Sequence, residues 1–252
     1  IASSIMSKKI AEGTGALVLD VKVGSGAFMK EIGQARELAS TMVALGTDAG
    51  VTTRALLTDM STPLGLTAGN ALEVAESLEV LAGGGPADVV DLTVALALEM
   101  CAAAGRPVGE DEVRAALADG RAMDIWRDMI SRQGELLTPW GERLDPDAPL
   151  PQAPETETVT APADGVLTTL DALAVGVAAW RLGAGRARKE DPVQAVAGVT
   201  MHAKPGDPVR ASQPLLTLHT ATPERFARAR EALAGGIVIS EAGSPEAADA
   251  VA

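Results

Sequence analysis

The feature that most constrains the fold is a strand–helix–strand pattern in residues 16–59. The run ALVLDVKV (16–23) is continuous in β-forming residues, which is typical of a buried strand, and VTTRALLTD (51–59) is a second strand. Between them, residues 31–49 repeat apolar side chains at helical spacing and stop at Gly50. Two strands joined by a long helix pair in parallel, so we predict a βαβ unit and an α/β fold.

The rest of the chain divides around a proline-rich segment. Residues 138–154 hold five prolines and show no periodicity, which predicts a linker. Before it we predict an α/β domain over 13–137, with a mixed sheet and flanking helices, in which 61–69 is a loop. After it, residues 155–252 alternate short strands with Gly/Pro turns, which predicts a β-rich α+β module. Further helices are predicted at 1–12, 70–81, 87–105, 110–118, 121–133, 175–181 and 223–234.

Composition excludes several classes of protein. The net charge of -13 has the wrong sign for a nucleic-acid backbone, so we expect no nucleic-acid partner, although one pocket can still be basic. The single cysteine, Cys101, excludes a disulfide framework and a cysteine-based zinc site. No apolar run reaches the ~18–20 residues of a membrane span, so no membrane partner is expected. Aromatic residues are only 2%, which predicts a core of aliphatic side chains.

Two short motifs near the start of the chain could bind a ligand. Ser4 and Lys8 share one helix face, with Ile1 and Ile5 beside them, and could recognise a small heterocycle with carbonyl oxygens. By spacing alone, such a pair more often consists of solvent-exposed side chains that bind no ligand. The glycine-rich turn in VKVGSGAFMK (21–30) could present N–H groups to an anion. It matches neither the dinucleotide fingerprint nor the P-loop, so a tight strand-to-helix turn is favoured.

A cation site is a further possibility around the loop PLGLT (63–67). This loop carries free carbonyls and precedes a helix that Asn70 and Glu73 are expected to open as a capping box. Glu76 follows about two turns into that helix, and carbonyl and carboxylate oxygens suit a hard cation. By pattern alone, a solvated helix residue is the more common role for such a glutamate.

The C-terminal segment has a likeness of its own. The turns in DGVL…KPGDPVRASQPLLTL resemble those of biotinyl or lipoyl carrier domains, but the modifiable lysine is missing. His202 and His219 lack metal-ligand spacing, so both are expected to be structural.

Longer stretches of the sequence resemble one enzyme family. They occur in the same order in the thymidine phosphorylase and pyrimidine-nucleoside phosphorylase family, and they extend over nearly the whole chain. The stretches are SSIMSKKIAEGTGALVLDVKVGSGAFMK, LLTDMSTPLGLTAGNALEVAESLEVL, APADGVLTTLDA and LGAGRARKED. The resemblance implies a small helical domain and a large mixed α/β domain with a mobile cleft between them. On this map, residues 1–12 are the end, or remnant, of the N-terminal helical domain.

The resemblance also implies a base-binding site. Ser4 and Lys8 fall on the family's contacts to the edge of the pyrimidine, with Lys8 as the catalytic residue. The positions of Ile1, Ile5 and Phe28 match apolar residues that line the base pocket.

A monovalent-cation site, suited to K⁺, is implied at the backbone oxygens of Leu64 and Thr67 and the carboxylate of Glu76. No organic cofactor is implied.

The implied activity is phosphorolysis of a pyrimidine nucleoside by inorganic phosphate. Thymidine is favoured over uridine because the VGSG turn looks more like that branch of the family. The family's phosphate-binding loop maps before Ile1, so the chain is expected to be part of a longer cytoplasmic, homodimeric enzyme and to be inactive alone. The alternatives are a phosphoribosyltransferase of the related fold, a non-catalytic carrier or binding module, and a degenerate product without activity.

Overall fold

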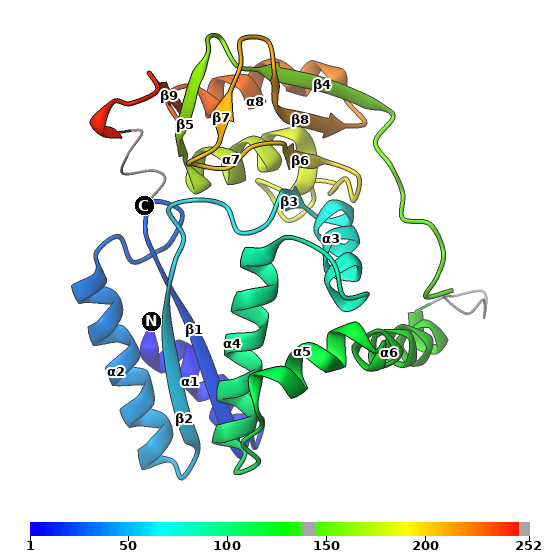
Figure 1. The fold of residues 1–252 in the computed structure, drawn as a ribbon. Helices are drawn as coiled ribbons and strands as arrows, with labels where there is room; N and C mark the ends of the chain where they lie inside the picture. The colour runs from blue at the N-terminus through cyan, green and yellow to red at the C-terminus, as the bar shows by residue number, and fades with distance from the viewer. Residues whose placement is uncertain (138–144, 247–252) are drawn as a thin grey trace.

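The computed structural model describes residues 1–137 and 145–246, whose arrangement is shown in Figure 1. The predicted βαβ unit is confirmed. Strands β1 (Ala16–Val23) and β2 (Thr52–Asp59) pair in parallel along their whole length, and α2 (Ile32–Asp48) connects them. Because parallel strands run in the same direction, the carboxyl ends of β1 and β2 meet at one edge of this small sheet.

An aliphatic core joins the first helix to this unit, as the low aromatic content predicts. The helix α1 (Ala2–Ala11) contacts α2, and its Met6 is almost fully buried. Met6 belongs to one apolar cluster with Val21, Ala35, Ala39 and Met42. This cluster fixes α1 against the sheet through one face and leaves the opposite face of the helix exposed.

The expectation that residues 16–23 form a buried strand is wrong in one respect. Val21 is the one buried residue of β1, and the other seven are half-buried. The reason is the size of the sheet, because within the described residues it has two strands. Among the described residues, no third strand pairs with either outer edge to bury it.

Four helices follow β2 in the chain. They are α3 (Ala71–Leu81), α4 (Ala87–Ala103), α5 (Glu110–Ala118) and α6 (Arg121–Leu137). Val80, Val94 and Leu117, from three of them, form a small apolar cluster, and α4 also contacts β1 and β2. No helix in the described part of the chain combines the length and the hydropathy needed to cross a membrane.

The C-terminal residues form the predicted β-rich module, drawn from green to red at the top of Figure 1. Its two antiparallel sheets have the strand orders β3–β6–β8–β4 and β7–β5–β9. The parallel strand pair and the antiparallel strand pairs therefore belong to different sheets. The strands are β4 (Glu155–Thr160), β5 (Gly165–Leu170), β6 (Gly198–Met201), β7 (Pro208–Val209), β8 (Pro214–Thr220) and β9 (Ile237–Ser240). The helices are α7 (Ala172–Ala179), continued by η1 (Trp180–Ala184), and α8 (Phe226–Leu233), preceded by η2 (Pro223–Arg225).

The prediction of a loop over residues 61–69 is wrong at its end. Residues Thr67–Gly69 form β3, which pairs antiparallel with β6, so that Thr67 lies opposite Thr200. This pairing partner is distant in the sequence, and no local pattern could reveal it. The stretch before α3 thus contributes an edge strand to the C-terminal sheet. The predicted linker at 138–154 lies partly outside the described residues, and the predicted domain boundaries stay predictions.

The predicted capping box at the start of α3 is also wrong. Asn70 occupies the N-cap position, but its side chain makes no cap hydrogen bond and its amide instead donates to the carbonyl of Ala184. Glu73 reaches back to the N–H of Gly69, one residue before the expected partner. The Asn70 side chain therefore contacts the C-terminal module in place of its expected hydrogen bond within the cap.

The close approach of α2 to β2 generates a stability prediction. A Cβ atom on Gly46 would lie 2.9 Å from Thr53 Cβ and 3.1 Å from Met6 Cε. We expect Gly46→Ala to lower the free energy of unfolding by roughly 1–3 kcal/mol, the usual cost of overpacking a core. Urea unfolding followed by circular dichroism measures this.

Gly33 provides the matched control, because it lies in the same helix and a Cβ atom there would meet no other atom within 4 Å. Gly33→Ala should leave the unfolding midpoint unchanged or slightly raised. Equal midpoints for the two variants would contradict the packing argument.

Candidate active site

The carboxyl ends of β1 and β2 are joined by a network of backbone hydrogen bonds. Met60 N donates to Val23 O at 2.7 Å, and Gly26 N donates to Met60 O at 2.9 Å. The hydroxyl of Ser25 donates to Ser61 O at 3.2 Å. Gly24 has a φ of +127°, and a Cβ atom there would lie 2.7 Å from the backbone nitrogen of Ser61. Only glycine fits this close approach of the two strand ends.

The glycine-rich turn is therefore a tight turn, the interpretation that its spacing favours. The N–H groups of Gly24, Gly26 and Ala27 donate to carbonyls of Met29, Met60 and Gly24, respectively. Three donors that an anion would need are thus already used within the protein.

The predicted base-binding residues lie on α1 and just after this turn. Ser4 and Lys8 are exposed, and Lys8 has no ion-pair partner among the described residues. Ile5, like Val23 and Met29, is half-buried and packs against the apolar cluster that contains Met6. Ile1 and Phe28 are 58% and 78% exposed. The structure thus presents a hydroxyl and an ammonium on an open helix face.

A charged pair that sequence reasoning missed lies on the sheet itself. Lys22 Nζ is 2.6 Å from Asp20 Oδ2, and the hydroxyl of Thr58 donates to the other oxygen of Asp20. The signal was present in ALVLDVKV, where the two charged residues alternate with apolar ones and so share a face. Lys22 also lines a pocket of about 390 Å³ that reaches Glu76 on α3.

The loop at 63–67 is held by three charged side chains from three parts of the chain. Glu76 Oε1 accepts from Leu66 N at 2.7 Å, and Asp88 Oδ2 accepts from Gly65 N at 3.0 Å. Lys204, from the C-terminal module, donates to Pro63 O at 2.5 Å and to Asp88 at 3.0 Å. Asp88 and Lys204 were missed because 116 residues separate them and neither belongs to a local motif.

The predicted cation ligands gather around this loop. Glu76 lies beside it, and the buried hydroxyl of Thr67 lies next to the Glu76 carboxylate. A hydroxyl and a carboxylate held side by side offer the oxygen ligands that a hard cation prefers. Leu64 lies in the same loop and is partly exposed. The ammonium of Lys204 disfavours the binding of a cation at this loop, because it already places one positive charge there.

The two carboxyl groups have opposite pKa shifts. Burial raises the pKa of Glu76 above its ordinary value of 4.5, and the nearby charge of Asp88 adds to this, although the Leu66 N–H and the Thr67 hydroxyl act in the other direction. Burial also acts to raise the pKa of Asp88. The hydrogen bonds from Lys204 and Gly65 and the positive charge of Lys204 outweigh it, so this pKa lies below its ordinary value of 3.8.

The two histidines make structural contacts. Thr200 Oγ1 lies 3.0 Å from His219 Nε2, and Thr217 Oγ1 lies 2.7 Å from His202 Nε2. Burial lowers the pKa of His219, and the charge of His202 lowers it further. Among the described residues, no group of three or more His, Cys, Asp or Glu side chains could hold a metal ion.

Comparison with known proteins gives two family matches that together span most of the chain. Residues 2–123 match the model of the glycosyl transferase family a/b domain, and residues 166–240 match the pyrimidine nucleoside phosphorylase C-terminal domain. Thymidine phosphorylase from Mycobacterium tuberculosis (strain ATCC 25618 / H37Rv) is 60% identical over 236 residues, which cover 94% of this chain and 53% of the relative.

The chain belongs to the thymidine phosphorylase and pyrimidine-nucleoside phosphorylase family. A second relative, the pyrimidine-nucleoside phosphorylase of Bacillus subtilis (strain 168), is 44% identical over 87% of this chain and 51% of its own length. That of Staphylococcus epidermidis (strain ATCC 12228 / FDA PCI 1200) is 42% identical over 89% of this chain and 52% of its own length. The chain spans about half the length of these relatives and matches their C-terminal part.

The charged side chains around the loop at 63–67 generate a prediction about how stability depends on pH. Because the pKa of Asp88 is lower in the folded state, its stabilising contribution is present above pH 3.8 and is lost as the pH falls through the folded pKa. We expect Asp88→Asn to lower the free energy of unfolding at pH 7 by about 1 kcal/mol, the scale of one net hydrogen bond. The difference from the native protein should shrink below pH 3.8.

Urea unfolding at a series of pH values measures this difference. Asp91→Asn is the control, because Asp91 lies on the same helix and its ion pair with Arg114 is exposed. A pH-independent loss in Asp88→Asn would contradict the assigned role of the carboxylate charge.

Proposed function

We propose that the full-length protein carrying this chain is a pyrimidine nucleoside phosphorylase. Inorganic phosphate attacks C1′ of the nucleoside, the bond from C1′ to the base nitrogen breaks, and the products are the free base and a pentose 1-phosphate. The observation that carries the proposal is the 60% identity to a thymidine phosphorylase over 94% of the chain. The exposed Ser4 and Lys8 on α1 are consistent with it, since both can reach a ligand.

Lys8 is the proposed catalytic residue. As the glycosidic bond breaks, negative charge develops on the leaving base, and a cation placed near a base carbonyl stabilises that charge. Lys8 can do this because no described acidic side chain neutralises its ammonium. Ser4, one turn away, can donate to a carbonyl oxygen or accept from a ring N–H, which selects pyrimidines by their hydrogen-bond pattern.

The apolar residues complete the proposed base site. Ile5 is fixed by its packing against the cluster under α1, whereas Ile1 and Phe28 are exposed and free to cover a flat ring. Thymidine is the proposed substrate in preference to uridine. We further propose a cytoplasmic homodimer, as the resemblance to the family implies.

The role of Lys8 can be tested in the full-length enzyme. We expect Lys8→Ala to lower kcat/KM for thymidine by ~10²–10³-fold, as removal of one stabilising donor does in other enzymes. The melting temperature should stay unchanged, because the Lys8 side chain is exposed. Thymine release, followed by absorbance, gives the rate.

Lys9→Ala is the matched control. Lys9 has the same charge and lies next in the same helix, but it pairs with Glu12 at 3.2 Å. If the two variants lose activity equally, general charge rather than Lys8 explains the effect, and near-normal turnover of Lys8→Ala would refute the assignment.

We also propose that Glu76, with the backbone oxygens of Leu64 and Thr67, takes part in a K⁺ site. The support is the position of the buried Thr67 hydroxyl beside the Glu76 carboxylate. Neutral oxygens and one carboxylate suit a monovalent ion better than Mg²⁺, which prefers octahedral geometry and retained waters. The bound ion would brace the loop that already links α3, α4 and the C-terminal module.

Titration with KCl tests this site. We expect K⁺, compared with a bulky organic cation at equal ionic strength, to raise both activity and melting temperature. At a concentration one hundred times Kd, binding to the folded state alone adds about 2.7 kcal/mol. Glu76→Gln should abolish the response, because it removes the one charged ligand of the proposed set.

Glu79→Gln is the control, since Glu79 is exposed on the same helix and its substitution changes the net charge equally. A K⁺ response that survives in Glu76→Gln would show that this carboxylate serves only to hold the N–H of Leu66.

A further inference from the structure

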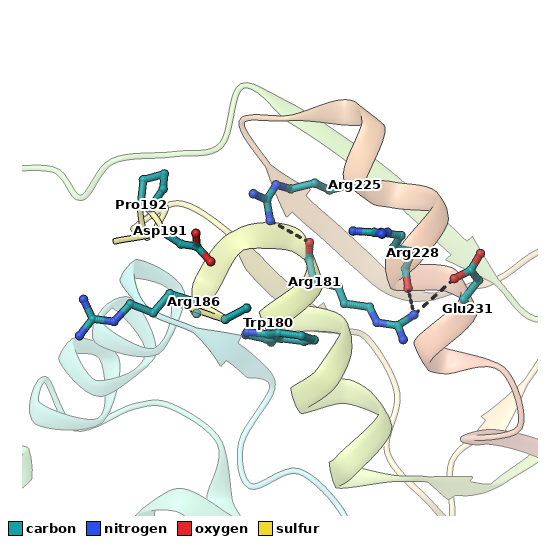
Figure 2. A pocket seen from close by; sticks show the side chains of 10 residues that line it. Trp180, Arg181, Arg186, Asp191, Pro192, Arg225, Arg228 and Glu231 are labelled. Carbon is teal, nitrogen blue, oxygen red and sulfur yellow. Dashed lines mark hydrogen bonds and ion pairs between the residues drawn. The ribbon is translucent and has the colours of Figure 1, made fainter. Parts of the chain in front are cut away.

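A cleft of about 530 Å³ lies between the η1 turn and helix α8 in the C-terminal module. Four arginines line it: Arg181 and Arg186 from η1 and the loop after it, and Arg225 and Arg228 from η2 and α8. Figure 2 shows the side chains of Arg225 and Arg228 extending above the η1 turn, with Trp180 below it. The cleft shares no residue with the candidate base or cation sites.

The local charge of this cleft is opposite to that of the whole protein. The chain carries a net charge of -13, whereas the cleft has four arginines against two acidic residues, Asp191 and Glu231. Both acids already have donors, because Glu231 lies 3.4 Å from Arg181 and Asp191 accepts from the N–H of Arg188 at 2.9 Å. Such a concentration of positive charge on an acidic protein favours an anionic ligand.

Two of the arginines are held in place by backbone carbonyls. Arg181 Nη1 donates to Arg228 O at 2.8 Å, and Arg225 Nη1 donates to Arg181 O at 3.2 Å. A guanidinium has five N–H donors, so each retains donors for a ligand. Arg228 uses none of its side-chain donors on another described residue, and its guanidinium is exposed. Two guanidinium groups with unused donors, Arg225 and Arg228, are therefore available on one side of the cleft.

Trp180 adds an aromatic surface to the same cleft. Its side chain lines the cleft and is 43% exposed, which is unusual for so large an apolar residue. Gly185 packs against the indole, since a Cβ atom there would lie 2.7 Å from Trp180 Cδ1. The chain that follows η1 thus restrains the ring. A restrained, exposed indole can stack on a planar ring.

We propose that this cleft binds a nucleoside monophosphate, with the phosphate at Arg225 and Arg228 and the base against Trp180. Guanidinium groups bind phosphate through paired, charge-assisted hydrogen bonds. A free phosphate alone would leave the indole uncovered and most of the 530 Å³ empty. The cleft volume lies in the ~300–1,000 Å³ range of small-molecule sites, so a nucleotide-sized ligand fits it better than a flat macromolecular surface does.

Calorimetric titration of the purified protein with guanosine 5′-monophosphate tests the proposal. A purine probe is chosen to avoid the pyrimidine site proposed on α1, and guanosine and inorganic phosphate are titrated separately. We expect saturable binding of the monophosphate, and weaker binding of guanosine alone and of inorganic phosphate alone. Arg228→Gln should lower the affinity for the monophosphate about tenfold, which corresponds to 1.4 kcal/mol.

Arg230→Gln is the matched control on the same helix. Arg230 lies outside the cleft, where it forms an ion pair with Glu157 at 2.5 Å, and its loss changes the net charge equally. Trp180→Leu should lower the affinity for the monophosphate but leave the affinity for inorganic phosphate unchanged. Circular dichroism checks that this variant is folded. Lys8→Ala should bind the monophosphate normally, which separates this site from the proposed base site.

Three results would overturn the proposal. The first is an absence of saturable monophosphate binding to the native protein. The second is equal weakening by Arg228→Gln and Arg230→Gln, which would indicate general charge attraction. The third is loss of binding in Lys8→Ala, which would place the ligand on α1 instead.

Discussion

The interaction on which the candidate cation site and the placement of the C-terminal module depend is the clamp on the loop at 63–67. Glu76 and Asp88 accept from backbone N–H groups of the loop, while Lys204 donates to one of its carbonyls. Two negative groups and one positive group thus satisfy backbone groups of residues 63–66, which precede β3 and have no regular structure. Because Lys204 comes from the C-terminal module, the clamp also fixes that module against the helices α3 and α4.

Most of the regular structure could be predicted from the sequence because it depends on local patterns. The bounds predicted for the strand at 16–23 agree with the structure, and the helix between the two strands differs by one residue at each end. Alternation, helical periodicity and glycine stops act over neighbouring residues, so the sequence displays them directly. The positions of Ser4 and Lys8 on one exposed helix face followed from the same kind of argument.

What could not be predicted depends on residues far apart in the chain. The strand at Thr67–Gly69 exists because of its partner at Gly198–Met201, and the Asn70 side chain leaves its expected cap for the carbonyl of Ala184. The arginine cleft likewise combines η1 with α8, whose residues show no common motif. In each case the energy comes from a tertiary contact that outweighs the local preference, so spacing alone carries no signal of it.

The pairing of β3 with β6 has a consequence for how the chain acquires its structure. During synthesis, Thr67 emerges from the ribosome long before Thr200, its partner in the sheet. Until then, residues 67–69 have no strand to pair with, and the large loop that must close makes this a late, entropically costly step. The helices before it can form early, whereas the loop at 63–67 stays unformed until β6 has been made. A nascent or truncated product would therefore expose this stretch to chaperones and proteases.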